Sequence, residues 1–235
     1  MNRDLVLIGG GHTHALAIKS LAMNPIPEVR LTLVSEQTLT PYSGMLPGYI
    51  AGHYSLAETH IDLNRLCQWA NVRWIKGRVS HIDPDSRQVL VDGRLVEYDK
   101  LSIDIGSTPD LSVPGAAQYA VGVKPVSHFN LAWEKLLTQA SVGDSSINHG
   151  SDQIGGNQPD SSIAGVRDWG VIGAGAGGVE LILAMAHRLG TQSSIRFHLI
   201  FSGKRILKGY PPRLIARAEK ALQQHGVQLL SLIHI

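Results

Sequence analysis

The sequence predicts an α/β fold in which two units, each built on a parallel sheet, follow one another along the chain. Two observations support this prediction. A fully apolar run, Leu5–Ile8, ends in three glycines, and a second run, Trp169–Ile172, ends in another glycine-rich stretch. Fully apolar runs are typical of parallel strands that are buried on both faces. The 235 residues are enough for two domains of ordinary size.

The composition excludes several functional classes. The formal net charge is +2, so no bulk electrostatic argument points to nucleic acid or to a membrane surface. We find no run of about 18 apolar residues that could form a membrane segment. The amino terminus has no signal-peptide pattern, and a single cysteine excludes an internal disulfide, so we expect a cytoplasmic protein. No metal site is predicted.

The first unit begins with the strand Leu5–Ile8. A helix is predicted over Ala15–Met23, where two prolines stop it, and the strand Leu31–Val34 follows. This strand–helix–strand unit of about 30 residues has the size of a mononucleotide-binding half. Short strands at hairpin spacing then predict an antiparallel meander over Val72–Ile75, Val79–Ile82, Val89–Val91 and Val96–Tyr98. The run Leu101–Ile105 is predicted to be another central strand.

The second unit is preceded by a helix predicted over Leu131–Gln139. A flexible loop is expected over about 141–165, because that stretch has hardly any large apolar side chains to bury. The strand Trp169–Ile172, a helix over about Val179–Arg188 and the strand Ile195–Phe201 complete the unit. The stretch Gln223–Leu229 is interpreted as the end of a helix leading into one more strand.

The second glycine loop matches a dinucleotide-binding fingerprint through Gly173, Gly175 and Gly178. The first glycine permits the tight turn, the second lets a pyrophosphate approach the backbone, and the third lets helix and strand pack closely. The helix amino terminus then offers free N–H groups to the phosphates. After the strand that ends at Phe201 come Ser202, Lys204 and Arg205, with no acid for a ribose 2′-hydroxyl. These residues favour NADPH, while NADH stays open because two cations are also typical of a solvated turn.

The first glycine loop departs from the fingerprint. Gly9 and Gly11 match, but His14 stands at the third glycine position, where a side chain should push the helix away or point along the groove. Glu36 ends the second strand, about 25 residues past Gly11, where an acid binds an adenosine ribose. We therefore predict two Rossmann-like three-layer ββα dinucleotide-binding domains, with one bound FAD and one nicotinamide cofactor.

Four stretches resemble one branch of the pyridine nucleotide–disulfide oxidoreductase superfamily, the branch associated with, and often fused to the amino terminus of, selenide, water dikinase. They are residues 9–14, 41–48, 101–109 and 209–213, and together they span nearly the whole chain. The resemblance implies that FAD contacts Gly9, Gly11, His12, His14, Glu36, Val79, Gly106 and Ser107, with Ser43, Gly44 and Met45 near the flavin ring. It implies that Gly173, Gly175 and Gly178 hold the nicotinamide cofactor, with Glu180 near its ring. Glu180 and Tyr42 are catalytic candidates from position alone, and for His12 and His14 loop and helix-cap hydrogen bonding competes with a proton-relay role.

One departure from the superfamily bears on the chemistry. Its disulfide reductases carry a redox cysteine pair shortly after the second strand, but residues 37–52 contain no cysteine. Cys67 is predicted to be a buried helix residue. We therefore expect an FAD-dependent NAD(P)H oxidoreductase that passes electrons to an external small-molecule or protein acceptor, linked to selenium metabolism as a partner of selenide, water dikinase. A type II NADH:quinone oxidoreductase and a nucleotide-binding redox sensor are the alternatives.

The predicted domains are an FAD-binding domain over 1–122 and an NAD(P)-binding domain over 123–229. Residues 230–235 equal a translated DNA-sequencing adapter and are expected to be foreign to the protein. The superfamily's last flavin motif, a Gly-Asp pair, and its carboxy-terminal domain do not occur in the sequence. A carboxy-terminally truncated fragment is therefore expected, one that binds FAD poorly and is inactive alone.

Overall fold

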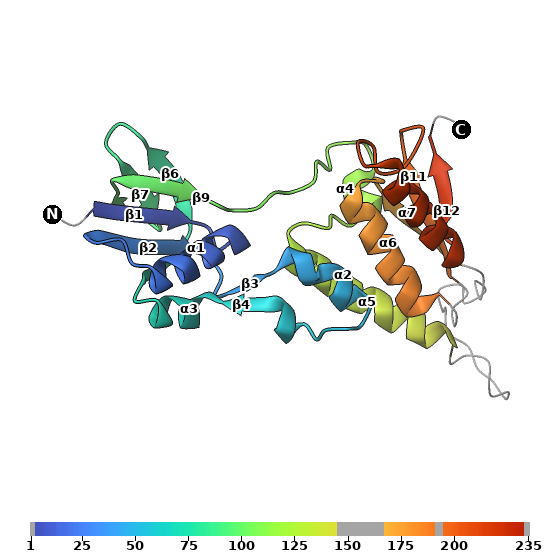
Figure 1. Ribbon diagram of the computed structural model, residues 1–235, viewed down its shortest axis with the longest axis horizontal. Coiled ribbons are helices and arrows are strands. Elements are labelled where there is room, and N and C mark those ends of the chain that lie inside the picture. The colour runs from blue at the N-terminus through green and yellow to red at the C-terminus, as the bar shows by residue number, and fades with distance from the viewer. Residues whose placement is uncertain (1–2, 145–166, 191–194, 233–235) are drawn as a thin grey trace, which may run out of the picture. The chain divides into compact units, whose positions relative to one another are not determined.

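The computed structural model describes residues 3–144, 167–190 and 195–232, and the chain divides into two compact units (Figure 1). The first unit contains Met1–Ser43 and Leu56–Phe129, and the second contains Gly44–Ser55 and Asn130–Ile235. The last division therefore falls inside helix α5 (Val126–Asp144), a few residues after the domain boundary predicted from the sequence.

The first unit has three layers. Its central layer is a parallel sheet in the order β5-β2-β1-β9. These strands are β1 (Arg3–Ile8), β2 (Val29–Ser35), β5 (Arg73–Lys76) and β9 (Lys100–Ile103). Helices α1 (His12–Met23) and α3 (Leu63–Trp69) pack on one face, and the antiparallel strands β6 (Val79–Asp83), β7 (Gln88–Val91) and β8 (Arg94–Glu97) form the third layer (Figure 1). A short helix, α4 (Ala116–Tyr119), follows β9.

Side chains that alternate along β1 build the two halves of this core. Leu7 packs with Ile18 of α1 and Leu63 of α3, whereas its neighbour Val6 packs with Val89 of β7. Successive side chains of a strand lie on opposite faces, so a strand covered on both sides is apolar at every position. This packing explains the apolar run that ends in the first glycine loop, and it confirms the three-layer prediction for this unit.

Two strand predictions in the first unit are wrong. Val72–Ile75 does not belong to the antiparallel meander, because β5 pairs in parallel with β2. A four-residue strand is too short for a distinctive pattern, and α3 brings it back beside β2. The prediction over Leu101–Ile105 is wrong in place and length: β9 is a parallel strand beside β1, but it ends at Ile103 and lies at one edge of the described sheet. Helix α1 also begins three residues before the predicted Ala15, so His12 and His14 lie in its first turn.

Between β3 (Leu39–Pro41) and β4 (His60–Asp62) the chain leaves the first unit and then returns to it. These two strands pair antiparallel, and the 3-10 turns η1 (Ser43–Met45) and η2 (Ala57–Thr59) follow and precede them. The segment Gly44–Ser55 belongs to the second unit, where α2 (Leu46–Ile50) packs against α6 (Ala176–Leu189). A five-residue helix has no periodic pattern that sequence analysis could detect.

The second unit repeats the strand–loop–helix–strand order around the parallel sheet β10-β11-β12. Its strands are β10 (Arg167–Ile172), β11 (Ile195–Phe201) and β12 (Gln228–Ser231), and α7 (Pro212–Gln224) joins α5 and α6 among its helices. Trp133 of α5 is fully buried, and its ring lies edge-on to Trp169 of β10 at a centroid distance of 6.2 Å. Trp169 makes a similar contact with Phe197 of β11 at 6.1 Å. These edge-to-face aromatic contacts help to hold α5 against the sheet.

The strands and helices predicted for the second unit are confirmed, with longer helices than expected. Helix α5 continues to Asp144, so the prediction of a flexible loop is wrong for residues 141–144, and residues 145–165 lie outside the described part of the chain. Extending a formed helix gains one hydrogen bond for each residue fixed, which lets it run into a polar stretch. Leu230 and Ser231, at the start of the expected foreign tail, continue β12 beside Ile200 and Phe201.

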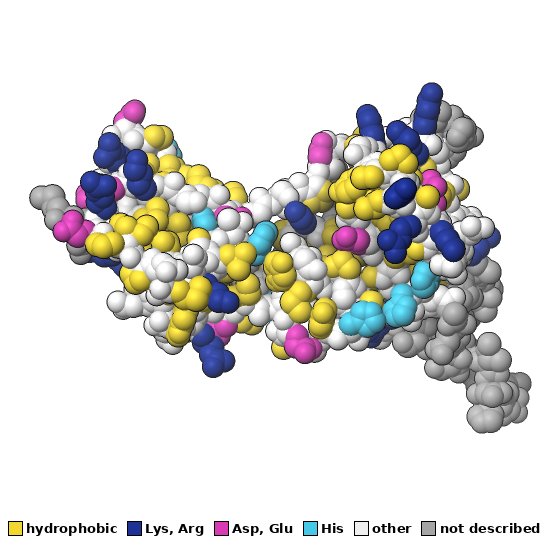
Figure 2. Space-filling view, viewed as in Figure 1, with side chains coloured by type: hydrophobic (Ala, Val, Ile, Leu, Met, Phe, Trp, Pro, Cys, Tyr) yellow, Lys and Arg dark blue, Asp and Glu magenta, His cyan; other side chains and the backbone are white. Residues whose placement is uncertain are grey.

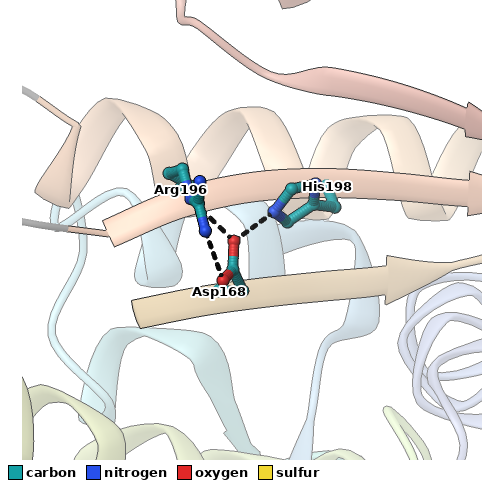
Figure 3. A network of polar contacts seen from close by, with 3 residues as sticks. All are labelled: Asp168, Arg196 and His198. Carbon is teal, nitrogen blue, oxygen red and sulfur yellow. Dashed lines mark hydrogen bonds and ion pairs between the residues drawn. The ribbon is translucent and has the colours of Figure 1, made fainter. Parts of the chain in front are cut away.

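The two units share an ion pair at the same place in their sheets. Asp4 of β1 pairs with Arg30 of β2, with Oδ2 and Nη2 2.8 Å apart. Asp168 of β10 pairs with Arg196 of β11 in the same register and at the same distance. His198 adds a contact of 2.6 Å from Nε2 to Asp168 Oδ1 (Figure 3). In both units the hydrogen-bonded guanidinium lowers the pKa of the carboxyl group. The first two strands of each unit therefore pair in the same register and carry the same ion pair.

Candidate functional site

The first glycine loop joins β1 to α1 at the carboxyl end of the sheet, where parallel α/β folds bind their ligands. Gly9 has φ +93° and donates its N–H to the carbonyl of Val34 at 2.8 Å. A Cβ on Gly9 would lie 2.2 Å from the carbonyl oxygen of Asp104, the residue after β9. Backbone conformation and close packing therefore both require glycine at this position.

His14 bridges the glycine loop and the neighbouring strand. Its side chain is 2% exposed, with Nδ1 2.7 Å from the carbonyl of Gly9 and Nε2 2.9 Å from the hydroxyl of Ser102 in β9. The carbonyl can only accept, so Nδ1 carries a proton and donates to it, while Nε2 shares a hydrogen bond with the hydroxyl. The buried side chain points into the unit and does not lie along an open groove. Both ring nitrogens take part in hydrogen bonds within the protein, which agrees with the alternative that His14 holds the loop by hydrogen bonding.

A carboxylate lies at the amino terminus of α1. Oδ2 of Asp104 accepts from the backbone N–H groups of Thr13 at 3.1 Å and His14 at 3.3 Å. A Cβ on Gly11 would lie 2.2 Å from the same oxygen. The phosphates of a dinucleotide bind at this point of a Rossmann unit, on the helix amides beside the second glycine. The first loop therefore fits a pyrophosphate once the Asp104 side chain moves away.

The other residues predicted to contact FAD lie around this carboxyl end of the sheet. Glu36 follows β2, is exposed, and has its Oε1 3.7 Å from Nε of Arg78, the residue before Val79. A Cβ on Gly106 would meet no atom within 4 Å, and the hydroxyl of Ser107 accepts from Nζ of Lys124 at 3.0 Å. A mostly exposed carboxylate and an open glycine leave room for a ribose and its phosphates.

The structure brings together two residues that were predicted separately. The rings of His12 and Tyr42 have centroids 5.6 Å apart, and both side chains are exposed in the first unit. Ser43, Gly44 and Met45 form the turn η1 directly after Tyr42, where the chain passes from the first unit to the second. Their approach to a flavin ring stays a prediction.

The second glycine loop has an open outer face. Gly173 has φ +108° and donates its N–H to the carbonyl of Ile200 at 2.8 Å. A Cβ at Gly173, Gly175 or Gly177 would meet no atom within 4 Å, whereas a Cβ at Gly178 would lie 1.8 Å from the carbonyl oxygen of Gly173. The loop thus packs tightly on its inner side and leaves a free cradle at the start of α6, which fits a pyrophosphate. Glu180, two residues further along α6, is exposed.

The basic turn after β11 is attached to this loop. The turn presents Ser202, Lys204 and Arg205 as exposed residues, while the next two residues, Ile206 and Leu207, are buried. The N–H of Leu207 donates to the carbonyl of Ala174 in the glycine loop at 2.8 Å. Within the described residues, neither cation forms an ion pair. Two unpaired positive charges therefore belong to the segment that binds an adenosine ribose in this fold.

Sequence reasoning missed a set of contacts that anchors α2 in the second unit. Tyr49 is 6% exposed and its hydroxyl donates to a carboxylate oxygen of Glu134 in α5. Burial and the Glu134 charge raise the pKa of this phenol. A Cβ on Gly52 would meet the guanidinium of Arg188 in α6. These partners are 85 and 136 positions apart, calculated as 134 − 49 and 188 − 52, and no local pattern connects them.

Three histidines that the sequence does not group also meet in the second unit. The ring of His187 lies 5.3 Å from that of His53 and 6.1 Å from that of His225. Histidine side chains lie together on the surface of this unit in Figure 2. Across the described residues no group of three or more His, Cys, Asp or Glu side chains is arranged to hold a metal ion.

Cys67 is a buried helix residue, as predicted. It lies in α3 with 1% of its surface exposed, and burial raises the pKa of its thiol to about 11. Since the thiolate is the reactive form, we expect less than about 1% labelling of native protein by a thiol reagent at pH 8 in the time that fully labels protein in urea. Rapid labelling of the native chain would contradict this burial. Replacing Cys67 with serine should leave any flavin reduction unchanged.

Two glycine loops at the carboxyl ends of two parallel sheets define the class of proteins with tandem dinucleotide-binding folds. Comparison with known families specifies this class further: residues 3–234 match the pyridine nucleotide-disulphide oxidoreductase family, and the chain belongs to it. FAD and NADH or NADPH are the cofactors of this family, which agrees with the cofactors predicted from the sequence.

Individual relatives are distant. The chain is 24% identical over 240 residues to the NADH dehydrogenase-like protein YutJ of Bacillus subtilis, a match that covers 99% of this chain and 58% of the relative. It is 26% identical over 159 residues to the sulfide-quinone reductase of Aquifex aeolicus, covering 66% of this chain and 35% of that protein. NDH2 of Plasmodium falciparum has the same fold, with a TM-score of 0.78 at 15% identity, over 98% of this chain and 48% of that structure. The chain thus spans little more than half the length of the first of these relatives.

Proposed function

We propose that this chain is the dinucleotide-binding part of an FAD-dependent NAD(P)H oxidoreductase, which passes a hydride from NAD(P)H to flavin and the electrons onward to an external acceptor. The observation that carries the proposal is the open glycine loop of the second unit, beside two unpaired cations. It occurs in a chain whose first unit also has a glycine loop between a strand and a helix, with Glu36 directly after its second strand. We assign FAD to residues 1–122 and the nicotinamide cofactor to residues 123–229.

The residues of the chain would bind and position the two cofactors. The backbone of Gly9, Gly11 and Gly106 would approach the flavin nucleotide, while Glu36 would accept from its adenosine ribose. Gly173, Gly175 and Gly178 would do the same for the nicotinamide nucleotide. FAD, when bound, supplies the acceptor for a hydride and the means to pass electrons on. Hydride transfer needs no obligatory acid or base, so Tyr42 and Glu180 are proposed only to position the reacting rings.

The acceptor is proposed to lie outside this chain, because residues 37–52 contain no cysteine and Cys67 is buried. A quinone is one candidate, supported by a relative named sulfide-quinone reductase. An oxidised selenium species, with selenide, water dikinase as a fused or separate partner, is the other, and it rests on the motif resemblance alone. No helix in the described residues is long and apolar enough to cross a membrane.

The function is tested by adding NADPH or NADH anaerobically to the chain reconstituted with FAD. Loss of the oxidised flavin absorbance within seconds supports an oxidoreductase, and bleaching over hours with tight nucleotide binding would favour a redox sensor. Reoxidation by a soluble quinone, compared with reoxidation by selenite, distinguishes the two acceptors. Since the fragment is expected to be inactive alone, the outcome that would contradict the proposed function is failure to bind both FAD and NAD(P)H, measured by flavin fluorescence and nucleotide titration.

Cofactor choice makes a separate prediction. Replacing Lys204 and Arg205 together with alanine should weaken NADPH binding by on the order of a hundredfold, because two charge-assisted contacts to the 2′-phosphate are lost. NADH binding should change by less than about threefold. Lys208→Ala, an exposed cation in the same turn, is the control. Equal losses for both nucleotides, measured by titration of flavin reduction, would contradict a role in selecting NADPH.

A further inference from the structure

The two glycine loops differ at the point where phosphate binds. In the second unit, a Cβ at Gly175 or Gly177 would meet no atom within 4 Å. In the first unit, a Cβ at Gly11, which corresponds to Gly175, would lie 2.2 and 2.5 Å from the two carboxylate oxygens of Asp104. One loop is open and the other is filled by an acidic side chain of the same unit.

The carboxylate of Asp104 is an anion that accepts hydrogen bonds, as a phosphate group is. Its Oδ2 accepts from the N–H groups of Thr13 and His14 at 3.1 and 3.3 Å. Free amides and the positive end of a helix stabilise an anion, whether this is a carboxylate or a phosphate. Within the described residues Asp104 forms no ion pair, so these amides are its charge-stabilising partners.

The backbone of Asp104 holds the carboxylate in this position. Its N–H donates to the carbonyl of Ile8 at 2.8 Å, and its carbonyl accepts from the N–H of Gly11 at 3.2 Å. An alanine side chain at this position could not reach the amides. The backbone hydrogen bonds do not depend on the side chain, so what the aspartate adds to this loop is a negative charge at the helix amides.

We propose that Asp104 is a built-in competitor for the pyrophosphate of FAD. Its carboxylate caps α1 and must leave the amides of Thr13 and His14 before the cofactor binds. The residue thereby stabilises the flavin-free unit and lowers its affinity for FAD. This inference rests on the proposed function, because it requires the first unit to bind FAD.

The test compares Asp104→Ala and Asp104→Asn with the unchanged 235-residue chain. Asp104→Ala should bind FAD about tenfold more tightly, because no carboxylate has to be displaced, and Asp104→Asn about threefold more tightly, because the charge is lost and the cap is retained. Asp62→Asn is the matched control. Asp62 caps α3 in the same unit by accepting from the N–H of Arg65 at 3.0 Å, so its replacement removes a helix-capping carboxylate other than the one at α1.

Two measurements distinguish the possible outcomes. FAD affinity is measured by quenching of flavin fluorescence, and hydrogen exchange of the Thr13 and His14 amides is followed without FAD. Tighter binding and faster exchange in Asp104→Ala, with neither change in Asp62→Asn, support the proposal. Weaker binding would make Asp104 a flavin ligand, and equal binding would mean that it does not compete; both overturn the proposal while the proposed function stands. If neither the unchanged chain nor any variant binds FAD, the proposed function fails as well.

Discussion

Gly178→Ala is expected to weaken NAD(P)H binding by on the order of a hundredfold and to destabilise the second unit by about 1–3 kcal/mol. The new Cβ would lie 1.8 Å from the carbonyl oxygen of Gly173, well inside van der Waals contact. Helix α6 must therefore move away from β10, and its amino-terminal amides move with it. Nucleotide titration and urea unfolding measure the two effects.

Gly177→Ala provides the matched control for this substitution. Gly177 is the preceding residue in the first turn of α6, but a Cβ there would meet no atom within 4 Å. Alanine is the better helix former by about 1 kcal/mol, so this variant should be as stable as the unchanged chain or more so. If both alanines weakened nucleotide binding equally, the tight contact with Gly173 would not be the cause.

His14→Ala is expected to destabilise the first unit by about 2–4 kcal/mol. The substitution leaves a cavity at a residue that is 2% exposed and removes the bridge from Gly9 to Ser102. His14→Gly should be worse by about a further 1 kcal/mol, although it restores the third glycine of the fingerprint, because glycine is unfavourable inside a helix. Unfolding is followed by the accessibility of Cys67, which is buried in the same unit.

His12→Ala is the control, because His12 is exposed in the same turn of the helix and should contribute less than about 0.5 kcal/mol. A stable His14→Gly variant would show that the fingerprint glycine, and not the histidine bridge, is the residue that the fold prefers. A large effect of His12→Ala would instead point to its ring contact with Tyr42.

The fold was predictable where the pattern is local. The apolar runs at β1, β2, β10 and β11 were recognised because each is covered on both faces, and the prolines after Met23 marked the end of α1. The strand β5 was assigned to the wrong sheet, because four residues carry no information about their partner. The segment Gly44–Ser55 was missed as a part of the second unit, since its partners Glu134 and Arg188 are distant in the sequence.

The sequence by itself determined that the chain has two glycine loops, each after a buried strand and before a helix, since glycine spacing and apolar periodicity are written along the chain. Only the tertiary structure decided what each loop can accept. At the third glycine position, the second unit leaves no room for a methyl group, while the first holds a buried histidine. At the phosphate position, the second loop is open and the first contains the carboxylate of Asp104. Gly11 and Asp104 are 93 positions apart, from 104 − 11, and meet because β9 pairs with β1.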